Sequence, residues 1–272
     1  MFNKLLKKTH KAITFPREYN YGFVLSGGAA RGFAHVGVIK ALEEHGIYPD
    51  VISGVSAGAI VGAMYADGYS TDEMFDIFSK KRLWEFTRLV VPKHGLLDIS
   101  GLRHVLEQSL RSKRIEDLKK PLFITATNFK TGVAEYFSKG NLVDAIVASS
   151  SIPVLFKPAE IDENIYVDGG IIDNFPIEPI RRKCHHLVGI HVNPIGKEEV
   201  KTGLLSIAIR TFHLSVAAEL EKKITALDYF FEPQELRKFG IMDISKAQEM
   251  CDIGYESAKK VLTGKKDKKE AG

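Results

Sequence analysis

Two short apolar segments near the start of the chain are each followed by a glycine turn and a helical pattern, and this arrangement constrains the fold most. The segment YGFVL (21–25) precedes SGGAARG, and VISG (51–54) precedes VSAG. Apolar residues then recur at helical spacing, up to Gly46 after the first turn and up to Ala66 after the second. This order predicts a βαβ unit with a parallel sheet and a right-handed crossover.

The remaining sequence extends this α/β pattern without an internal repeat or a linker. A hairpin is expected from PLFITATNF and VAEYFS, which KTG separates. Apolar runs predict further strands in NIYVD, in residues 186–192 and in DYFFEP. The pattern predicts a loop over 90–100 and helices over 71–78, 101–110, 142–151, 203–226 and 245–262.

The charge distribution separates the two ends of the chain from its body. The whole chain of 272 residues carries +4; residues 1–20 carry +4, residues 259–272 carry +4, and residues 21–258 therefore carry −4. Basic ends can act as solubilising tails or can attract anionic lipid head groups. We expect a basic amphipathic segment (1–20), one folded domain (21–262) and a disordered lysine-rich tail (263–272).

Few features point to a secreted or membrane-spanning protein. The two cysteines, Cys184 and Cys251, have neither a metal-binding nor a disulfide spacing. No apolar run reaches the roughly 18 residues that a spanning helix needs. Without a secretory signal, a cytoplasmic location is the default. The lysines and apolar residues of 1–15 also suggest a helix on the inner face of a membrane, with a helix packed on the body as the alternative.

The second turn has the form of a nucleophile elbow. Gly54 and Gly58 flank Ser56 in a Gly-x-Ser-x-Gly pattern, with an apolar strand before it and a helix after it. The glycines remove Cβ atoms that would collide in so sharp a turn, and the helix N-terminus favours developing negative charge. A strand packed closely on a helix, with no catalytic role, is the alternative.

The first turn is a candidate oxyanion loop. Gly27 and Gly28 can adopt backbone angles that direct N–H groups into a cavity. A dinucleotide loop fits less well, since Ala29 replaces the middle glycine of G-x-G-x-x-G and no acidic residue follows the second strand. A Walker loop is excluded, and a structural turn stays open. Arg31 would pin the loop, attract an anionic head group or form a surface salt bridge.

None of the nine histidines stands in a late loop after a strand, where a Ser-His-Asp hydrolase keeps its base. His35, at the start of the first helix, is the one nearest the glycine loop. Asp168 ends an apolar strand before Gly169 and Gly170, a position that suits a general base. The alternative is an Asp-Gly turn residue, and Asp162 and Asp173 are competitors for the role of base.

Together the motifs SGGAARG, GVSAG and YVDGG, in this order, resemble the patatin-like phospholipase family. SSSIPVLFKP, GLLD, DYFFEP and DIGYESAKKVL also resemble its bacterial members, so the resemblance covers about residues 21–262. It implies a three-layer α/β/α fold with a mostly parallel central sheet. It also implies a Ser56–Asp168 dyad without histidine, oxyanion amides from Gly27, Gly28 and Ala29, and support from Arg31 and Gly32. Ala29 departs from the glycine often found there, but an alanine can present its N–H if its φ stays negative.

The implied activity is hydrolysis of lipid acyl esters through an acyl-enzyme, of the phospholipase, lysophospholipase or esterase type. The resemblance implies no metal and no cofactor. We expect a lipid or acyl-ester substrate, peripheral contact of the basic termini with anionic membranes, and no nucleic-acid partner. Two alternatives remain: a carboxylesterase or acyl-CoA thioesterase acting on soluble substrates, and a non-catalytic lipid-binding protein on the same fold.

Overall fold

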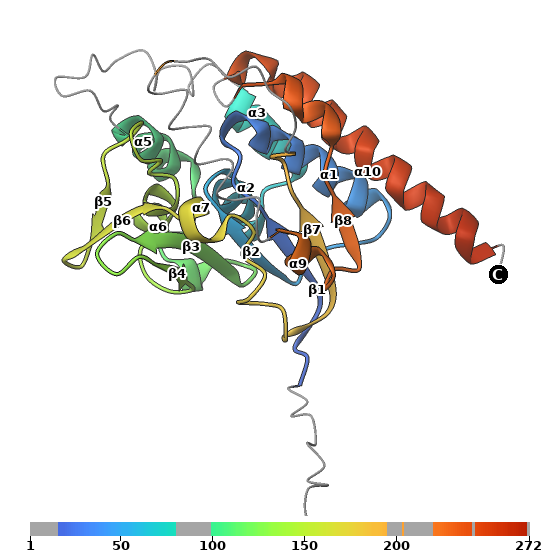
Figure 1. Ribbon diagram of the computed structural model, residues 1–272, viewed down its shortest axis with the longest axis horizontal. Coiled ribbons are helices and arrows are strands. Elements are labelled where there is room, and N and C mark those ends of the chain that lie inside the picture. Colours follow the sequence, from blue (N-terminus) through green and yellow to red (C-terminus); the bar gives the residue numbers. More distant parts are fainter. Residues whose placement is uncertain (1–15, 80–98, 195–202, 204–219, 241–242, 271–272) are drawn as a thin grey trace, which may run out of the picture.

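A mixed, mostly parallel sheet forms the centre of the molecule in the computed structural model (Figure 1), which describes residues 16–79, 99–194, 203, 220–240 and 243–270. Its described strands are β1 (Tyr19–Leu25), β2 (Val51–Val55), β3 (Leu122–Asn128), β4 (Val133–Phe137), β5 (Ala159–Ile161), β6 (Asn164–Asp168), β7 (Cys184–Ile190) and β8 (Tyr229–Phe231). Their order is β5-β6-β3-β2-β1-β7-β8, and β4 pairs with β3. The pairs joining β3, β2, β1, β7 and β8 are parallel, as the βαβ pattern predicts.

The helices connect these strands and cover the sheet. They are α1 (Phe33–Glu44), α2 (Ala57–Ala66), α3 (Thr71–Ser79), α5 (Ser100–Ser109), α6 (Leu142–Ser149), α7 (Gly170–Asp173), α9 (Leu220–Ile224) and α10 (Ala247–Glu270). Short 3₁₀ helices are η1 (Ala29–Gly32), η3 (Ile115–Asp117), η4 (Gln234–Lys238) and η5 (Ile244–Lys246). None of the described helices is both long enough and apolar enough to cross a bilayer.

Strand β1 shows how the two faces of the sheet are covered. Phe23 and Leu25 pack into the large core that includes residues of α1, α2 and α10. Val24, on the opposite face, packs with Phe175 and Ile177 of the segment after α7. Because successive side chains of a strand point to opposite faces, an all-apolar strand requires cover on both sides. The predicted α/β class with a mostly parallel sheet is confirmed.

The ends of β2 and β6 meet beside one edge of β3. Val55, the last residue of β2, pairs with Thr125, and Asp168, the last residue of β6, pairs with the next residue, Ala126. Strand β4 occupies the other edge of β3. Since β2 is parallel and β6 antiparallel to β3, their carboxyl ends approach each other, so Ser56 and Asp168 are brought together.

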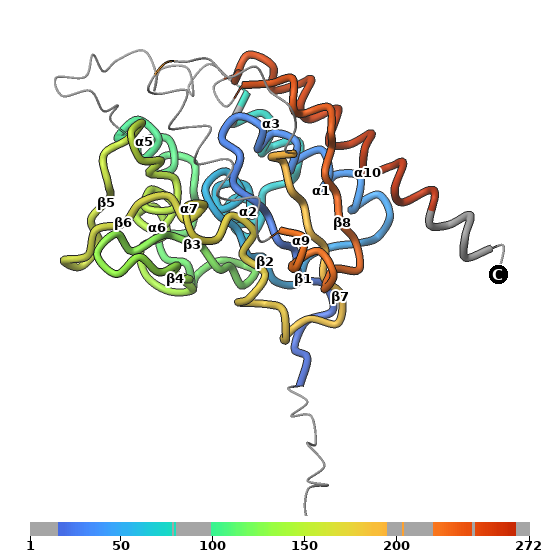
Figure 2. The backbone as a smooth tube through the Cα atoms, in the orientation of Figure 1, coloured from blue at the N-terminus to red at the C-terminus, as the bar shows by residue number. Residues whose placement is uncertain are grey.

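The last helix returns to pack on the first (Figure 1). A Cβ atom on Gly37 of α1 would lie 1.9 Å from the Cys251 carbonyl oxygen of α10, and one on Gly254 would lie 2.2 Å from the Ala34 oxygen. Both contacts are far below van der Waals distance, so the two backbones can approach this closely only with glycine at these positions. Figure 2 follows the chain from β8 to α10, beside the elements formed by its first residues.

Most of the predicted elements are present, with differences at the ends. The β3–β4 hairpin is confirmed, and β5 is an additional strand that sequence patterning missed. It forms a second hairpin with β6 through Asp162 and Glu163, both at positive φ. The predicted segment 1–15, the loop over 90–98 and most of the helix over 203–226 lie outside the described residues. The last helix is longer than predicted, since α10 runs to Glu270.

Candidate active site

Ser56 occupies the turn between β2 and α2 in a strained conformation. Its φ of 52° and ψ of −121° are rare for a residue with a side chain, and such a conformation costs about 1–3 kcal/mol. A Cβ atom on Gly54 would lie 2.5 Å from the Gly58 oxygen, and one on Gly58 would lie 2.3 Å from the Leu25 oxygen. The two glycines are therefore sterically required by the turn, which explains the Gly-x-Ser-x-Gly pattern.

The backbone of the elbow is held by α6. Ser56 N–H donates to Ser149 Oγ at 2.8 Å, and Ser149 Oγ donates to the Thr125 carbonyl of β3 at 2.6 Å. Ser56 itself stands at the N-terminus of α2 and is 5% exposed. Its side chain therefore lies where the helix dipole favours negative charge.

Asp168 is buried at the end of β6, and only one of its carboxylate oxygens is paired. Gly170 N–H donates to Oδ1 at 2.8 Å, whereas Oδ2 has no hydrogen-bond partner among the described residues. Burial raises the pKa of Asp168 to about 7, although interaction with the Ser56 side chain and the Gly170 N–H partly opposes this rise. No hydrogen bond of normal geometry joins Ser56 to Asp168; such bonds often tighten only when substrate binds.

The glycine loop after β1 carries unpaired backbone donors. Within the described part of the chain, the N–H groups of Gly27, Gly28 and Ala29 make no hydrogen bond. Gly27 and Gly28 are buried and Ala29 is partly so. Since buried N–H groups are normally paired, three consecutive free donors suit an anionic oxygen.

The conformation of Ala29 differs from the one expected. Its φ is +48°, not negative, yet its N–H makes no hydrogen bond within the described residues and so stays available as a donor. A left-handed conformation costs an alanine about 1–2 kcal/mol, which glycine avoids. Ala29 opens the 3₁₀ turn η1, in which Arg31 N–H donates to the Gly28 oxygen. The turn thus imposes on Ala29 the angles for which a glycine is better suited.

The loop packs directly against the elbow. A Cβ atom on Gly27 would lie 3.2 Å from Ser56 Cβ and 2.5 Å from Asn174 Oδ1, and one on Gly32 would lie 2.7 Å from Ala57 Cβ. On the side of Asp168, a Cβ atom on Gly169 would lie 2.3 Å from the Thr125 oxygen. Glycine therefore provides the clearance that brings the loop, the serine and the aspartate together.

Arg31 is a buried anchor of the loop. It is 4% exposed, and its Nε and Nη2 donate to the Phe239 carbonyl at 3.0 and 2.7 Å. Nη1 donates to Asn193 Oδ1 at 3.4 Å. Of the roles considered for Arg31, pinning the loop is the one these contacts support; attraction of a head group and a surface salt bridge both need an exposed side chain.

His35 is fully buried, and its Nε2 donates to the Ser26 carbonyl at 2.9 Å. Burial lowers the pKa of His35 to about 4, so it is neutral at physiological pH. His191 bonds Glu232 at 2.9 Å. The other described histidines lie away from the glycine loop: His45 caps the end of α1, His104 is exposed on α5, and His185 and His186 are exposed on β7. His10, His94 and His213 lie outside the described residues.

The two competing aspartates are placed differently. Asp162 lies in the exposed turn between β5 and β6, at the other end of the strand from Asp168. Asp173 is buried, but both of its carboxylate oxygens accept hydrogen bonds: Oδ1 from Lys223 at 2.6 Å and Oδ2 from Tyr136 at 2.8 Å. Only Asp168 combines burial with an unpaired oxygen beside Ser56.

Three polar residues join the site without having been predicted. Ser149 holds the Ser56 backbone. Asn174 is buried beside Gly27, with Nδ2 lacking a partner among the described residues. Asn193 bonds the Gly27 carbonyl at 2.9 Å. The repeated serines before Ile152 and the Asn-Phe-Pro after α7 were the available signals, but neither indicates which atom it contacts. Within the described ranges, no cluster of His, Cys, Asp or Glu is arranged to hold a metal.

Comparison with known proteins decides the family. The family model described as patatin-like phospholipase matches residues 23–181, more than half of the chain. The chain belongs to the patatin-like phospholipase family. The matched range includes the glycine loop, Ser56 and Asp168.

Curated relatives of this patatin-like chain include lysophospholipases of yeasts. Lysophospholipase NTE1 of Kluyveromyces lactis is 27% identical over 281 residues, which cover 92% of this chain and 20% of that protein. Lysophospholipase NTE1 of Saccharomyces cerevisiae is 27% identical over 275 residues, 89% of this chain and 16% of that protein. The chain thus spans a fifth or less of the length of these relatives.

A solved structure has the same fold. VipD of Legionella pneumophila superposes with a TM-score of 0.52 at 16% identity, over 91% of this chain and 67% of that one. At this identity the likeness concerns the fold alone. It agrees with the mixed, mostly parallel sheet described above.

Proposed function

We propose that this patatin-like protein hydrolyses acyl esters of lipids with a Ser56–Asp168 dyad. The observation that carries the proposal is the Asp168 carboxylate beside Ser56 on a strained elbow. This carboxylate is buried, has a pKa of about 7, and has an Oδ2 atom without a partner among the described residues. A general base works best when its pKa lies near the operating pH. The yeast relatives named lysophospholipases support a single-chain phospholipid as substrate.

In the proposed first half-reaction, Ser56 Oγ attacks the ester carbonyl carbon and Asp168 takes the hydroxyl proton. The carbonyl oxygen becomes negative and binds the free N–H groups of Gly27, Gly28 and Ala29. The C–O bond to the alcohol then breaks, and Asp168 returns the proton to the leaving alkoxide. An acyl-enzyme on Ser56 remains.

In the second half-reaction, water replaces the alcohol. Asp168 takes a proton from the water as its oxygen attacks the acyl carbon, and the same N–H groups bind the second oxyanion. Collapse breaks the bond to Ser56 Oγ, and the proton held by Asp168 restores the hydroxyl. The products are a fatty acid and the deacylated alcohol, and no group beyond water is consumed.

A screen of the purified protein against defined lipids tests this proposal. We expect fatty acid to be released from lysophospholipid, and a fluorophosphonate probe to label Ser56. Ser56→Ala should abolish both signals while the circular dichroism spectrum stays unchanged. No labelling of Ser56 in the folded protein would favour a lipid-binding protein. Turnover limited to soluble esters or acyl-CoA would favour a carboxylesterase or thioesterase.

We also propose that the basic termini, residues 1–20 and 263–272, bring the enzyme to the anionic lipids on the inner face of the cytoplasmic membrane. Their net charges of the same sign support this, since each basic residue near an anionic surface contributes about 1 kcal/mol. Removing residues 1–18 should weaken binding to vesicles that contain phosphatidylserine. Unchanged binding would contradict this part of the proposal.

A further inference from the structure

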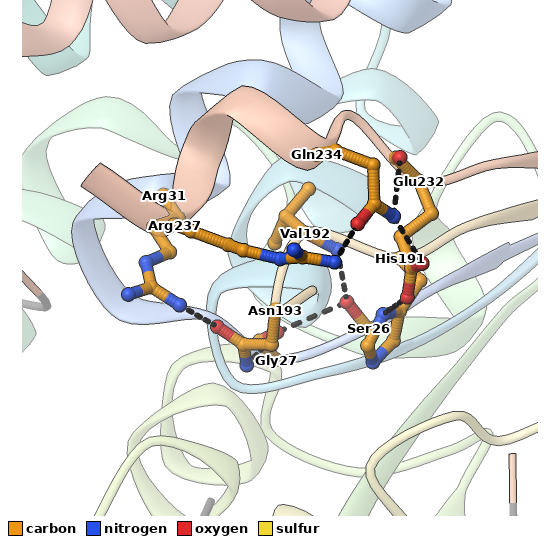
Figure 3. A network of polar contacts seen from close by, with 9 residues as sticks. All are labelled: Ser26, Gly27, Arg31, His191, Val192, Asn193, Glu232, Gln234 and Arg237. Carbon is orange, nitrogen blue, oxygen red and sulfur yellow. Dashed lines mark hydrogen bonds and ion pairs between the residues drawn. The ribbon is translucent and has the colours of Figure 1, made fainter. Parts of the chain in front are cut away.

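The carbonyl of Gly27 is held by two donors on the side of β7. Ser26 Oγ donates to it at 3.0 Å and Asn193 Nδ2 at 2.9 Å (Figure 3). The peptide between Gly27 and Gly28 is trans, so its C=O and N–H point in opposite directions. Fixing the carbonyl toward Asn193 therefore makes the Gly28 N–H point in the opposite direction, within the same peptide plane.

We propose that Asn193 is a positioning residue for the oxyanion loop, because its amide holds the Gly27 carbonyl and so orients the Gly28 N–H toward the substrate oxygen. The inference rests on the proposed function. It goes beyond that function by assigning a role to a residue outside the glycine loop, the elbow and the aspartate turn.

The orientation of the Asn193 amide is determined by its second partner. Asn193 Oδ1 accepts from Arg31 Nη1 at 3.4 Å, and the same guanidinium donates twice to the Phe239 carbonyl. A cation can face only the amide oxygen, so the amide NH₂ must face the Gly27 carbonyl. Arg31 thus pins the loop and at the same time selects the rotamer in which Asn193 is a donor.

Ser26 is held so that its hydroxyl proton also points at Gly27. Its Oγ accepts from Val192 N–H at 3.0 Å, which leaves its hydrogen for the Gly27 carbonyl. Its own N–H donates to the Ile190 oxygen and its own oxygen accepts from His35. Every polar group of Ser26 is used, so the residue preceding the loop is a rigid base for it.

The extension of β7 that carries Asn193 is itself braced. His191 N–H donates to the Phe231 carbonyl at 2.9 Å, and its Nδ1 contacts Glu232 Oε1 at 2.9 Å (Figure 3). His191 and Asn193 are both nine-tenths buried or more. The segment 191–193 therefore has little freedom to move away from the loop.

Apart from Ser26 and Arg31, the residues that brace the loop come after the part of the chain that the family model matches, which ends at residue 181. Asn193, Phe231 and Phe239 belong to the returning C-terminal part, which packs beside β1 and α1 (Figure 2). Residues 23–181 alone would lack these contacts. The geometry of the oxyanion loop in this protein thus depends on residues more than 160 positions away in sequence.

The test compares two replacements of Asn193 in the full chain. Asn193→Asp keeps the shape and the contact with Arg31, which becomes an ion pair, but cannot donate to the Gly27 carbonyl at neutral pH. Asn193→Ala loses both contacts. Asn164→Asp is the control, because Asn164 also donates an amide hydrogen bond to a backbone carbonyl, at 3.2 Å, in the remote β5–β6 turn.

We expect Asn193→Asp to lower kcat by about 10- to 100-fold on a short-chain ester, with KM nearly unchanged, since a misplacement of about 1 Å can cost about 10²-fold. The Ki of a trifluoromethyl ketone, which mimics the tetrahedral oxyanion, should rise by the same factor. The melting temperature should match that of the wild type, and Asn164→Asp should be fully active.

Full activity of Asn193→Asp, with loss of activity only in Asn193→Ala, would overturn the proposal and leave Asn193 as an anchor for Arg31. A rise in KM with unchanged kcat would overturn it as well. Failure of the proposed function has a different signature, namely that the wild type itself hydrolyses no ester and takes up no fluorophosphonate.

Discussion

Two buried aspartates lie near the two ends of the short helix α7, and the groups around them differ completely. Asp168 precedes the helix, is 1% exposed, and receives one hydrogen bond within the described part of the chain, from Gly170 N–H. Asp173 ends the helix, is 5% exposed, and receives hydrogen bonds from Lys223, Tyr136 and Phe175 N–H. One carboxylate is neutralised by a cation, and the other has no ion-pair partner among the described residues.

The difference shows how one short turn can hold a reactive and a structural carboxylate. Burial without a cation penalises the charged form, so the pKa of Asp168 is raised to about 7 and the group can exchange a proton. An ion pair between Lys223 and Asp173 at 2.6 Å ties α7 to α9. The surroundings, not the residue type, separate the two roles.

The largest expected effect is on catalysis. Asp168→Asn removes the base but keeps the size of the side chain and an oxygen for Gly170 N–H, so kcat/KM should fall by about 10³–10⁴-fold or more. Asp173→Asn should keep activity within about tenfold, because its carboxylate contacts no reacting atom. Initial rates on a short-chain ester at pH 8 measure both.

A second measurement on the same two variants is the labelling of Ser56 by a fluorophosphonate probe. Labelling should be lost in Asp168→Asn and kept in Asp173→Asn. Equal losses in the two variants would mean that the two aspartates do not differ as their surroundings imply.

The second effect is on stability, and it concerns the ion pair of Asp173 and not Asp168. Lys223→Met leaves the Asp173 carboxylate buried without its cation, which should lower the free energy of unfolding by about 3–5 kcal/mol. Asp173→Asn leaves the mostly buried Lys223 ammonium unpaired and should cost a similar amount. Urea unfolding at pH 7 measures both, and a double variant should cost less than the sum of the two.

The third effect is a gain in stability when Asp168 is neutralised. The pKa of Asp168 in the folded state is raised, so its ionisation destabilises the protein as pH rises from the unfolded value near 4 through about 7. Asp168→Asn should therefore stabilise the protein at pH 8 by up to about 4 kcal/mol, and by nothing near pH 4. Thermal melts of both proteins across this range test the sign; a destabilised variant at pH 8 would contradict it.

Local features of the site could be predicted from sequence because local sterics determine them. The glycines around Ser56 are required by contacts within the β2–α2 turn and with the end of β1, and the pattern GVSAG carries that requirement in five letters. The apolar strands and the βαβ order were predictable for the same reason. Periodicity alone shows which side chains must be covered.

The features of the site that the sequence left open or missed depend mostly on contacts between residues far apart in the chain. Asp168 pairs opposite Ala126 because β6 runs against β3, a register that no local pattern indicates. Sequence alone left Asp162 and Asp173 as competitors, because the partners of Asp173 come from β4 and α9. The positive φ of Ala29 was likewise not predicted, since the 3₁₀ turn that begins there determines it.

The smallest effect is on the pH profile, and it separates the two aspartates most directly. If Asp168 must be ionised to act as base, kcat/KM should rise about tenfold per pH unit below a midpoint near 7 and level off above it. Activity at pH 6 should then be about a tenth of the plateau.

Asp173→Asn should shift this midpoint by less than about half a unit, because Asp173 is already neutralised by Lys223 in the wild type. His35, whose pKa burial lowers to about 4, contributes no step near 7, so His35→Gln should keep the midpoint even if it lowers the rate. A midpoint that disappears in His35→Gln would assign the titrating base to the histidine and would remove the distinction between Asp168 and Asp173.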